Sequence, residues 1–142
     1  MTDYRYHRDL TRTGGLFAFS DGIYRLSQYL GKHPDQPVVA AEWGIRRQLQ
    51  ILSQGQMNPA EIFQYPFDPT PAALAGFDAA LERTLRVRGT RYIFTAGTIG
   101  PAHRFPEFER VLTSHGMAPY LEHTSYQRNG EPIYVVYTAR PK

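Results

Sequence analysis

Hydrophobic residues recur at helical spacing in four stretches of the chain. In each stretch the apolar side chains stand three or four positions apart, which places them on one face of an α-helix. N-cap residues or closing glycines flank the stretches, and Thr70 before Pro71 is the clearest start signal. The pattern predicts helices over residues 21–31, 45–54, 71–87 and 105–115.

Shorter apolar runs between these helices predict strands. The run Pro37-Val-Val-Ala-Ala-Glu42 is typical of a strand that is covered on both faces. Further strands are expected over residues 60–65, 91–97, 118–126 and 132–139. The last two flank Asn129-Gly130, a strong signal for a type I′ hairpin turn, and this register would place Arg128 opposite Glu131.

The order of these elements predicts the fold class. Strands that alternate with helices favour a parallel sheet with right-handed crossovers, and the final hairpin would make one edge antiparallel. We therefore expect an α/β fold: a three-layer αβα sandwich, Rossmann-like in the broad sense, with a mostly parallel sheet and an antiparallel C-terminal hairpin. Residues 1–15 would be a polar lead-in or linker, and residues 16–142 a single α/β domain, as the length suggests.

Composition narrows the class of protein. The chain is 42% hydrophobic and 20% charged, which is ordinary for a globular domain. No run approaches the roughly 18 consecutive apolar residues that span a bilayer, and the polar start of the chain has no signal-peptide core. Because the chain has no Cys, disulfides, cysteine zinc sites and thiol nucleophiles are excluded.

The net charge is +3 and nearly all basic residues are Arg. Basic residues gather only near the end of the helix predicted over 71–87, at Arg83, Arg86, Arg88 and Arg91. Cations suit the dipole at a helix C-terminus, so a solvated helix end is favoured over an anion site. No signature of a nucleic-acid module is present, and no nucleic-acid partner is expected.

Polar and aromatic residues follow two predicted strands that would be neighbours. Glu42 and Trp43 end the first strand, Thr95 and Thr98 end the third, and His103 lies in the loop after it. In an open α/β sheet ligands bind in the crevice at such strand ends. Trp43 could stack on a sugar or base while Glu42 accepts hydrogen bonds from hydroxyls. The alternative is structural: Trp43 covers a core edge and Glu42 caps the helix that follows it.

No complete catalytic motif accompanies this crevice. No two His stand at i, i+4, so a metal site is not expected, and the glycine loops match neither nucleotide fingerprint. Ser20 lacks a nucleophile elbow, and helix capping accounts for Ser20 and Asp21. A carboxylate pair of Asp21 and Glu42 is a minor alternative, because sequence does not give their separation. We predict no catalytic residue and no cofactor.

Three segments together resemble a known family. They are Thr13-Gly-Gly with Phe19-Ser20-Asp21-x-Ile-Tyr24, then Pro37-Val-Val-Ala-x-Glu42-Trp43-Gly44-Ile, and Leu49-x-x-Leu-x-x-Gly55. Over residues 10–65 the chain resembles the C-terminal extracytoplasmic domain of polytopic membrane glycosyltransferases of the dolichyl-phosphate-mannose-protein mannosyltransferase type. Asp21, Tyr24, Glu42, Trp43 and Gly44 match the motif positions.

The resemblance implies a parent enzyme that transfers a sugar from a lipid-linked donor. The catalytic acid of that family lies between transmembrane helices, in a segment that this chain lacks. The domain would then be a non-catalytic accessory or binding domain at the extracytoplasmic face of the membrane, where it would position the acceptor. Its partners would be the membrane-embedded part of the parent and a carbohydrate or lipid-linked sugar. If the chain is complete, a soluble cytoplasmic location is expected instead.

Two other functions stay open. A small soluble enzyme that uses a nucleotide or S-adenosylmethionine would fit the element order, although the first strand lacks the acidic-Gly-x-Gly loop of such enzymes. A protein-interaction module, such as a homodimer, would fit the Tyr-rich stretch from Ile133 to Tyr137, which could extend a sheet across a partner.

Overall fold

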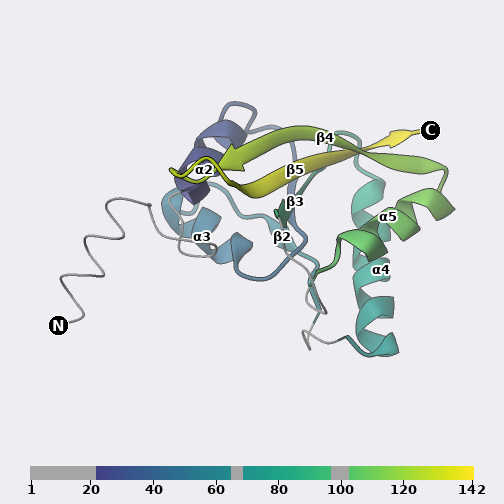
Figure 1. Ribbon diagram of the computed structural model, residues 1–142. Helices are drawn as coiled ribbons and strands as arrows, with labels where there is room; N and C mark the ends of the chain where they lie inside the picture. The colour runs from purple at the N-terminus through teal and green to yellow at the C-terminus, as the bar shows by residue number, and fades with distance from the viewer. Residues whose placement is uncertain (1–21, 65–68, 97–102) are drawn as a thin grey trace.

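The computed structural model describes residues 22–64, 69–96 and 103–142 (Figure 1). The helices are α2 (Gly22–Gly31), α3 (Ile45–Leu52), α4 (Pro71–Leu85) and α5 (Phe105–Ser114). The strands are β1 (Val38–Ala40), β2 (Ala60–Glu61), β3 (Arg91–Thr95), β4 (Met117–Tyr126) and β5 (Pro132–Pro141). The predicted helices and strands are thus found in order, with β1 and β2 shorter than expected. The segment predicted as a lead-in lies outside the described residues.

The five strands form one mixed sheet in the order β2-β1-β3-β5-β4. The parallel ladders β1–β2 and β1–β3 pair two and three residues, whereas the antiparallel ladders β3–β5 and β4–β5 pair five and nine. The prediction of a three-layer, Rossmann-like sandwich with a mostly parallel sheet is therefore wrong. Most of the paired residues are antiparallel.

The sheet is mostly antiparallel, and not mostly parallel as predicted, because of the position of β5. The chain passes through α5 to β4 at the edge of the sheet, and β5 then returns between β3 and β4. Ile133 and Val136 are fully buried and Tyr134 is 2% exposed, so this strand gains a complete apolar environment in the interior. The Tyr-rich stretch that was expected to offer a free edge is therefore internal, and β4 forms the edge.

Helices pack on both faces of the sheet (Figure 1). Because successive strand residues point to opposite faces, Ile93 joins one hydrophobic cluster while Tyr92 and Phe94 join the other. The first cluster includes residues of α2 and α3, and the second includes residues of α4 and α5. The central helix side chains are Leu26, Leu49, Phe77 and Phe108.

The turn between β4 and β5 is not the predicted type I′ turn. Gly130 has a φ of 89°, whereas Asn129 does not adopt the positive φ that type I′ requires. The backbone N–H of Gly130 donates to the carbonyl of Gln127 at 3.0 Å, and the N–H of Gln127 donates to the carbonyl of Glu131 at 2.8 Å. The pair across the turn is thus Gln127 and Glu131. The geometry is that of a type I turn followed by a left-handed glycine.

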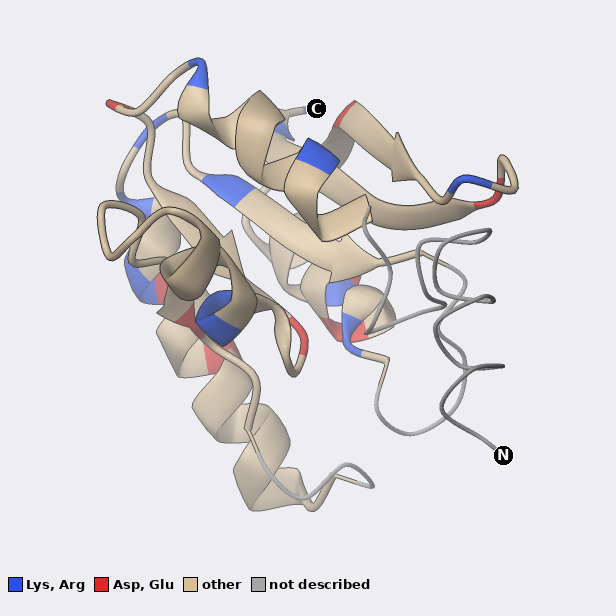
Figure 2. Cartoon of the chain, turned by 90° about the vertical axis from the view of Figure 1, so that its left-hand side faces the viewer, with Lys and Arg blue, Asp and Glu red and all other residues tan. Residues whose placement is uncertain are grey.

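Charge differs between the two helical layers, and Figure 2 marks basic positions in blue and acidic positions in red. Helices α2 and α3 carry three arginines and no acid: Arg25, Arg46 and Arg47. Helices α4 and α5 carry four acids and two arginines: Asp78, Glu82, Arg83, Glu107, Glu109 and Arg110. Within the helices themselves, α2 and α3 are therefore net positive, and α4 and α5 are net negative.

Candidate functional site

Glu42 joins the carboxyl ends of β1 and β3 to the start of α5. Its Oε1 accepts a hydrogen bond from the backbone nitrogen of Thr95 at 2.7 Å. Its Oε2 accepts from Nδ1 of His103 at 2.9 Å and from the backbone nitrogen of Arg104 at 3.0 Å. The residue is only 3% exposed. Glu42 is therefore a buried carboxylate with several charge-assisted hydrogen bonds.

The local backbone explains this orientation. Ala41 continues the strand, because its N–H donates to the carbonyl of Ile93 at 3.0 Å. Gly44 then adopts a φ of 87° as N-cap residue of α3, a conformation that suits glycine. A structural capping role was the predicted alternative for Glu42, but the helix differs. Glu42 binds the N-terminus of α5, where an acid is favoured, and not that of α3.

The contact with Glu42 orients His103. A carboxylate only accepts hydrogen bonds, so in the tautomer in which Nδ1 of His103 donates to Glu42, Nε2 is the acceptor nitrogen of the ring. The imidazole is 24% exposed and stacks beside Phe105 with ring centroids 6.2 Å apart. His103 can therefore offer an oriented acceptor to a hydroxyl group of a ligand.

The structure brings together part of the predicted site. Glu42 forms hydrogen bonds with both Thr95 and His103, and Trp43, the next residue in the chain, is 53% exposed. Tyr24 is 57% exposed on the separate helix α2. Asp21 and Thr98 lie outside the described residues.

Arg104 belongs to this edge, and sequence reasoning missed it. It is 1% exposed, its guanidinium lies 4.4 Å from the ring centroid of Phe63, and its Nη2 donates to the carbonyl of Gln64 at 3.1 Å. Burial lowers the pKa of Arg104, and the nearby charge of Glu42 opposes that shift. No motif distinguishes this arginine from the exposed ones, so the sequence held no signal for it.

A second buried arginine also departs from prediction. Arg91 was expected to belong to a solvated helix end, yet it is 2% exposed in β3. Its Nε lies 3.0 Å from Oε1 of Glu122, which also accepts a hydrogen bond from the hydroxyl of Tyr29. His123 stacks on Tyr29 with a centroid distance of 3.7 Å. Through the contacts of Tyr29 with Glu122 and His123, this cluster holds α2 against β4.

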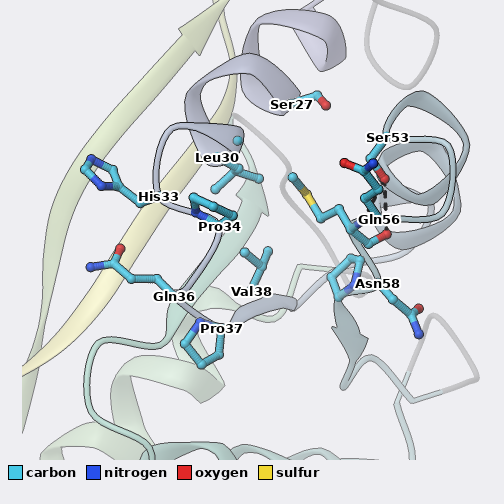
Figure 3. Close-up of a pocket in the computed structure, with 13 residues that line it drawn as sticks. Ser27, Leu30, His33, Pro34, Gln36, Pro37, Val38, Ser53, Gln56 and Asn58 are labelled. Carbon is cyan, nitrogen blue, oxygen red and sulfur yellow. Dashed lines mark hydrogen bonds between the residues drawn. The ribbon is translucent and has the colours of Figure 1, made fainter.

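Two cavities lie at the opposite, amino edge of the sheet. One of about 370 Å³ separates the ends of α2 and α3 from the start of β1 (Figure 3). Its apolar walls include Leu30, Pro34, Val38, Met57 and Pro59. The other, of about 420 Å³, lies beside the end of α4 and includes Arg86 and Arg88. Neither cavity includes the predicted strand-end residues.

Metal binding and membrane crossing were searched over the described ranges. Within residues 22–64, 69–96 and 103–142, no group of three His, Cys, Asp or Glu side chains could hold a metal ion. No helix in the same ranges is long and apolar enough to cross a bilayer.

Comparison with known proteins adds no assignment. No protein-family model matches the chain, and no solved structure matches it significantly.

Proposed function

We propose that this chain is a non-catalytic accessory or binding domain of a membrane glycosyltransferase that uses a lipid-linked sugar donor. It would lie at the extracytoplasmic face of the membrane, beside the membrane-embedded part of the parent protein, and position the acceptor. The resemblance of residues 10–65 supports the parent class. The observation that carries the non-catalytic role is the set of hydrogen bonds that Glu42 accepts.

Glu42 is the acid at the edge where α/β proteins bind ligands, but its environment suits a structural role. A general base must reach a proton of the substrate, whereas Glu42 is 3% exposed and both of its oxygens accept hydrogen bonds. Among the described residues of this edge, the exposed indole of Trp43 and the partly exposed imidazole of His103 would contact a ligand. An aromatic face and a hydrogen-bond acceptor suit the apolar faces and hydroxyls of a sugar.

Saccharide binding tests the role of this edge. The chain is titrated with a panel of mono- and oligosaccharides by calorimetry, and Trp43→Ala is expected to weaken binding by about 10-fold through loss of stacking. His103→Gln should also weaken it, whereas His115→Gln, at an exposed His after α5, serves as the matched control. No binding across the panel would remove the proposed ligand role. Transfer of a lipid-linked sugar by the chain alone would contradict a non-catalytic domain.

The parent assignment has a separate test. The reading frame that encodes the chain is expected to encode hydrophobic membrane-spanning segments as well. A frame that encodes only these 142 residues would overturn the assignment.

A homodimeric interaction module is a second candidate, favoured by the edge strand β4. Tyr120, Leu121 and Tyr126 on this strand are 47–50% exposed. An unpaired strand edge with exposed apolar side chains can pair with another chain. Light scattering over a wide concentration range tests this candidate, and a strictly monomeric species would argue against it. The third alternative, an enzyme using a nucleotide or S-adenosylmethionine, is tested by thermal-shift screening against those compounds.

A further inference from the structure

The cavity between the ends of α2 and α3, which we call the α2–α3 cavity, is lined by both apolar and polar side chains (Figure 3). Leu30 is 1% exposed and belongs to the hydrophobic cluster of α2 and α3, and Val38 and Met57 pack against that cluster. The volume of about 370 Å³ falls within the range of about 300–1,000 Å³ that is typical of small-molecule sites. The α2–α3 cavity is therefore large enough for a small organic ligand.

The loop that forms one wall after α3 is held by a Schellman motif. The backbone N–H of Gln54 donates to the carbonyl of Ile51 at 3.1 Å, and that of Gly55 donates to the carbonyl of Gln50 at 2.8 Å. Gln54 adopts the left-handed φ of 56° that this motif requires. The end of α3 therefore has a fixed backbone where it borders the cavity.

A serine and two prolines stiffen the remaining walls. Oγ of Ser53 accepts a hydrogen bond from the backbone nitrogen of Met57 at 2.8 Å, which closes the turn that carries Met57. Pro34 and Pro37, on the loop between α2 and β1, each have a fixed φ. Because walls of this kind keep their shape when the cavity is empty, a ligand loses little affinity to the ordering of the protein.

The walls of the α2–α3 cavity favour an uncharged ligand. Of the described residues that line it, none is Asp, Glu, Lys or Arg. His33 is the only titratable residue among them, and its ring points away from Leu30 and Val38 (Figure 3). Since burial of an ion without a counter-charge is costly, a charged ligand would bind poorly.

Ser27 offers a hydroxyl group to the cavity. A serine within a helix can donate to a carbonyl of the preceding turn, as Ser114 of α5 does to Val111 at 2.7 Å. The hydroxyl of Ser27 makes no such bond with the described residues of α2. Its side chain lies at the opposite end of the cavity from Pro37 (Figure 3). A hydroxyl group can both donate to and accept from a ligand.

We propose that the α2–α3 cavity binds a small uncharged molecule made of an aromatic ring and a hydroxyl group. The ring would pack against Pro34 and Met57, and a thioether sulfur makes favourable contacts with aromatic rings. The hydroxyl group of the ligand would form a hydrogen bond with Ser27. The cavity lies at the edge of the sheet opposite to Glu42 and Trp43, so the inference does not depend on the proposed function.

Amide chemical shifts of the isotope-labelled 142-residue chain test the inference. Benzyl alcohol is the probe, and benzoate and benzylammonium are analogues of similar size that carry a charge. Benzyl alcohol should shift amide signals within residues 27–38 and 53–58 in a saturable manner, with a dissociation constant on the order of 1 mM or lower. The two ions should bind at least about 10-fold more weakly.

Two substitutions of Ser27 separate the hydrogen bond from the space. Ser27→Ala should weaken the binding of benzyl alcohol about 5-fold, which is equivalent to the roughly 1 kcal/mol that a hydrogen bond contributes. Ser27→Phe should abolish binding by filling the cavity, and an unchanged or higher midpoint in urea denaturation would show that the variant is folded. Gln28→Ala is the matched control, because Gln28 is exposed on α2 and does not line the cavity. Its effect should stay within about 2-fold.

Shifts that do not saturate, or that arise mainly outside the two segments, would overturn the inference. Equal binding of benzyl alcohol and the two ions would also overturn it, as would unchanged binding by Ser27→Ala. Shifts of the same amides with protein concentration alone would show that a second copy of the chain occupies the cavity, and this result too would contradict the inference.

Discussion

Oε1 of Glu42 lies 2.7 Å from the backbone nitrogen of Thr95, so a side chain continues the hydrogen bonding between β1 and β3 beyond the last residue of β1. The same carboxylate accepts the N–H of Arg104 at the start of α5. One buried acid therefore joins three backbone segments and fixes the edge on which Trp43 and His103 stand.

Replacing Glu42 by Gln should destabilise the domain by about 2–3 kcal/mol. The amide retains the shape of the side chain, but its NH₂ group would face N–H donors and leave a buried donor without an acceptor. Urea denaturation measures the change. Glu61→Gln, at an exposed position of β2, should stay within about 0.5 kcal/mol of the unmodified chain. Equal effects of the two substitutions would contradict the structural role of Glu42.

Replacing Arg91 by Met should cost about 3 kcal/mol, because it leaves the carboxylate of Glu122 without its buried cation. Adding Glu122→Gln to this variant removes the uncompensated charge, so the double variant should lose less than the sum of the two single losses. A double-mutant cycle in urea denaturation gives the coupling energy. Simple additivity would show that the two side chains do not act as a pair.

Acid should weaken the fold through His123. Burial lowers the pKa of His123 below its ordinary 6.5, with Lys32 and Arg91 acting in the same direction and Glu122 opposing them. The unfolded chain therefore takes up a proton near pH 6.5 while the folded chain stays neutral. The contribution of His123 is fully present above pH 6.5 and is lost as the pH falls toward its folded pKa. Denaturation midpoints between pH 7.5 and 5 should fall less for His123→Gln than for the unmodified chain.

Alkali should weaken the fold through three tyrosines. Burial raises the pKa of Tyr29, Tyr92 and Tyr134 from 10.0 to about 12 each, and a hydrogen bond to Glu122 adds to the shift of Tyr29. Their contribution is fully present below pH 10 and is lost as the pH rises through about 12. Phenolate absorbance should show these groups still protonated at pH 11 in the folded chain. Titration of all ten tyrosines near pH 10 without unfolding would contradict the buried environments.

Sequence predicted the elements better than their arrangement. Thr70 accepts a hydrogen bond from the N–H of Ala73, as its predicted N-cap role requires, because capping depends only on neighbours in the chain. The insertion of β5 beside β3 depends on which distant strand buries Ile133 and Val136 best, and no local pattern encodes that choice. The prediction of a mostly parallel sheet failed because it could not include this pairing between distant strands.

In the candidate site, too, the local features could be predicted from the sequence and the features that depend on distant residues could not. The position of Glu42 and Trp43 after a buried strand correctly predicted where both residues lie, since strand ends share an edge. The sequence did not show that the side chain of Glu42 is buried while that of Trp43 is exposed. These orientations depend on the left-handed backbone of Gly44 and on backbone N–H donors more than 50 residues away in the chain. The burial of Arg91 and Arg104 could not be predicted from the sequence, because an arginine becomes buried only when partners from other elements surround it.

The place of β5 has a consequence for biosynthesis. A ribosome delivers β3, α5 and β4 before β5, yet β4 touches the rest of the sheet through β5. Until residues 132–141 have emerged, β3 has an open edge and the nascent β4 has no strand partner in this sheet. Unpaired edges of this kind are where newly made chains associate wrongly. The domain therefore completes its sheet only after β5 has been made, and a chain that stops before β5 would expose the edges of β3 and β4 that β5 covers in the complete sheet.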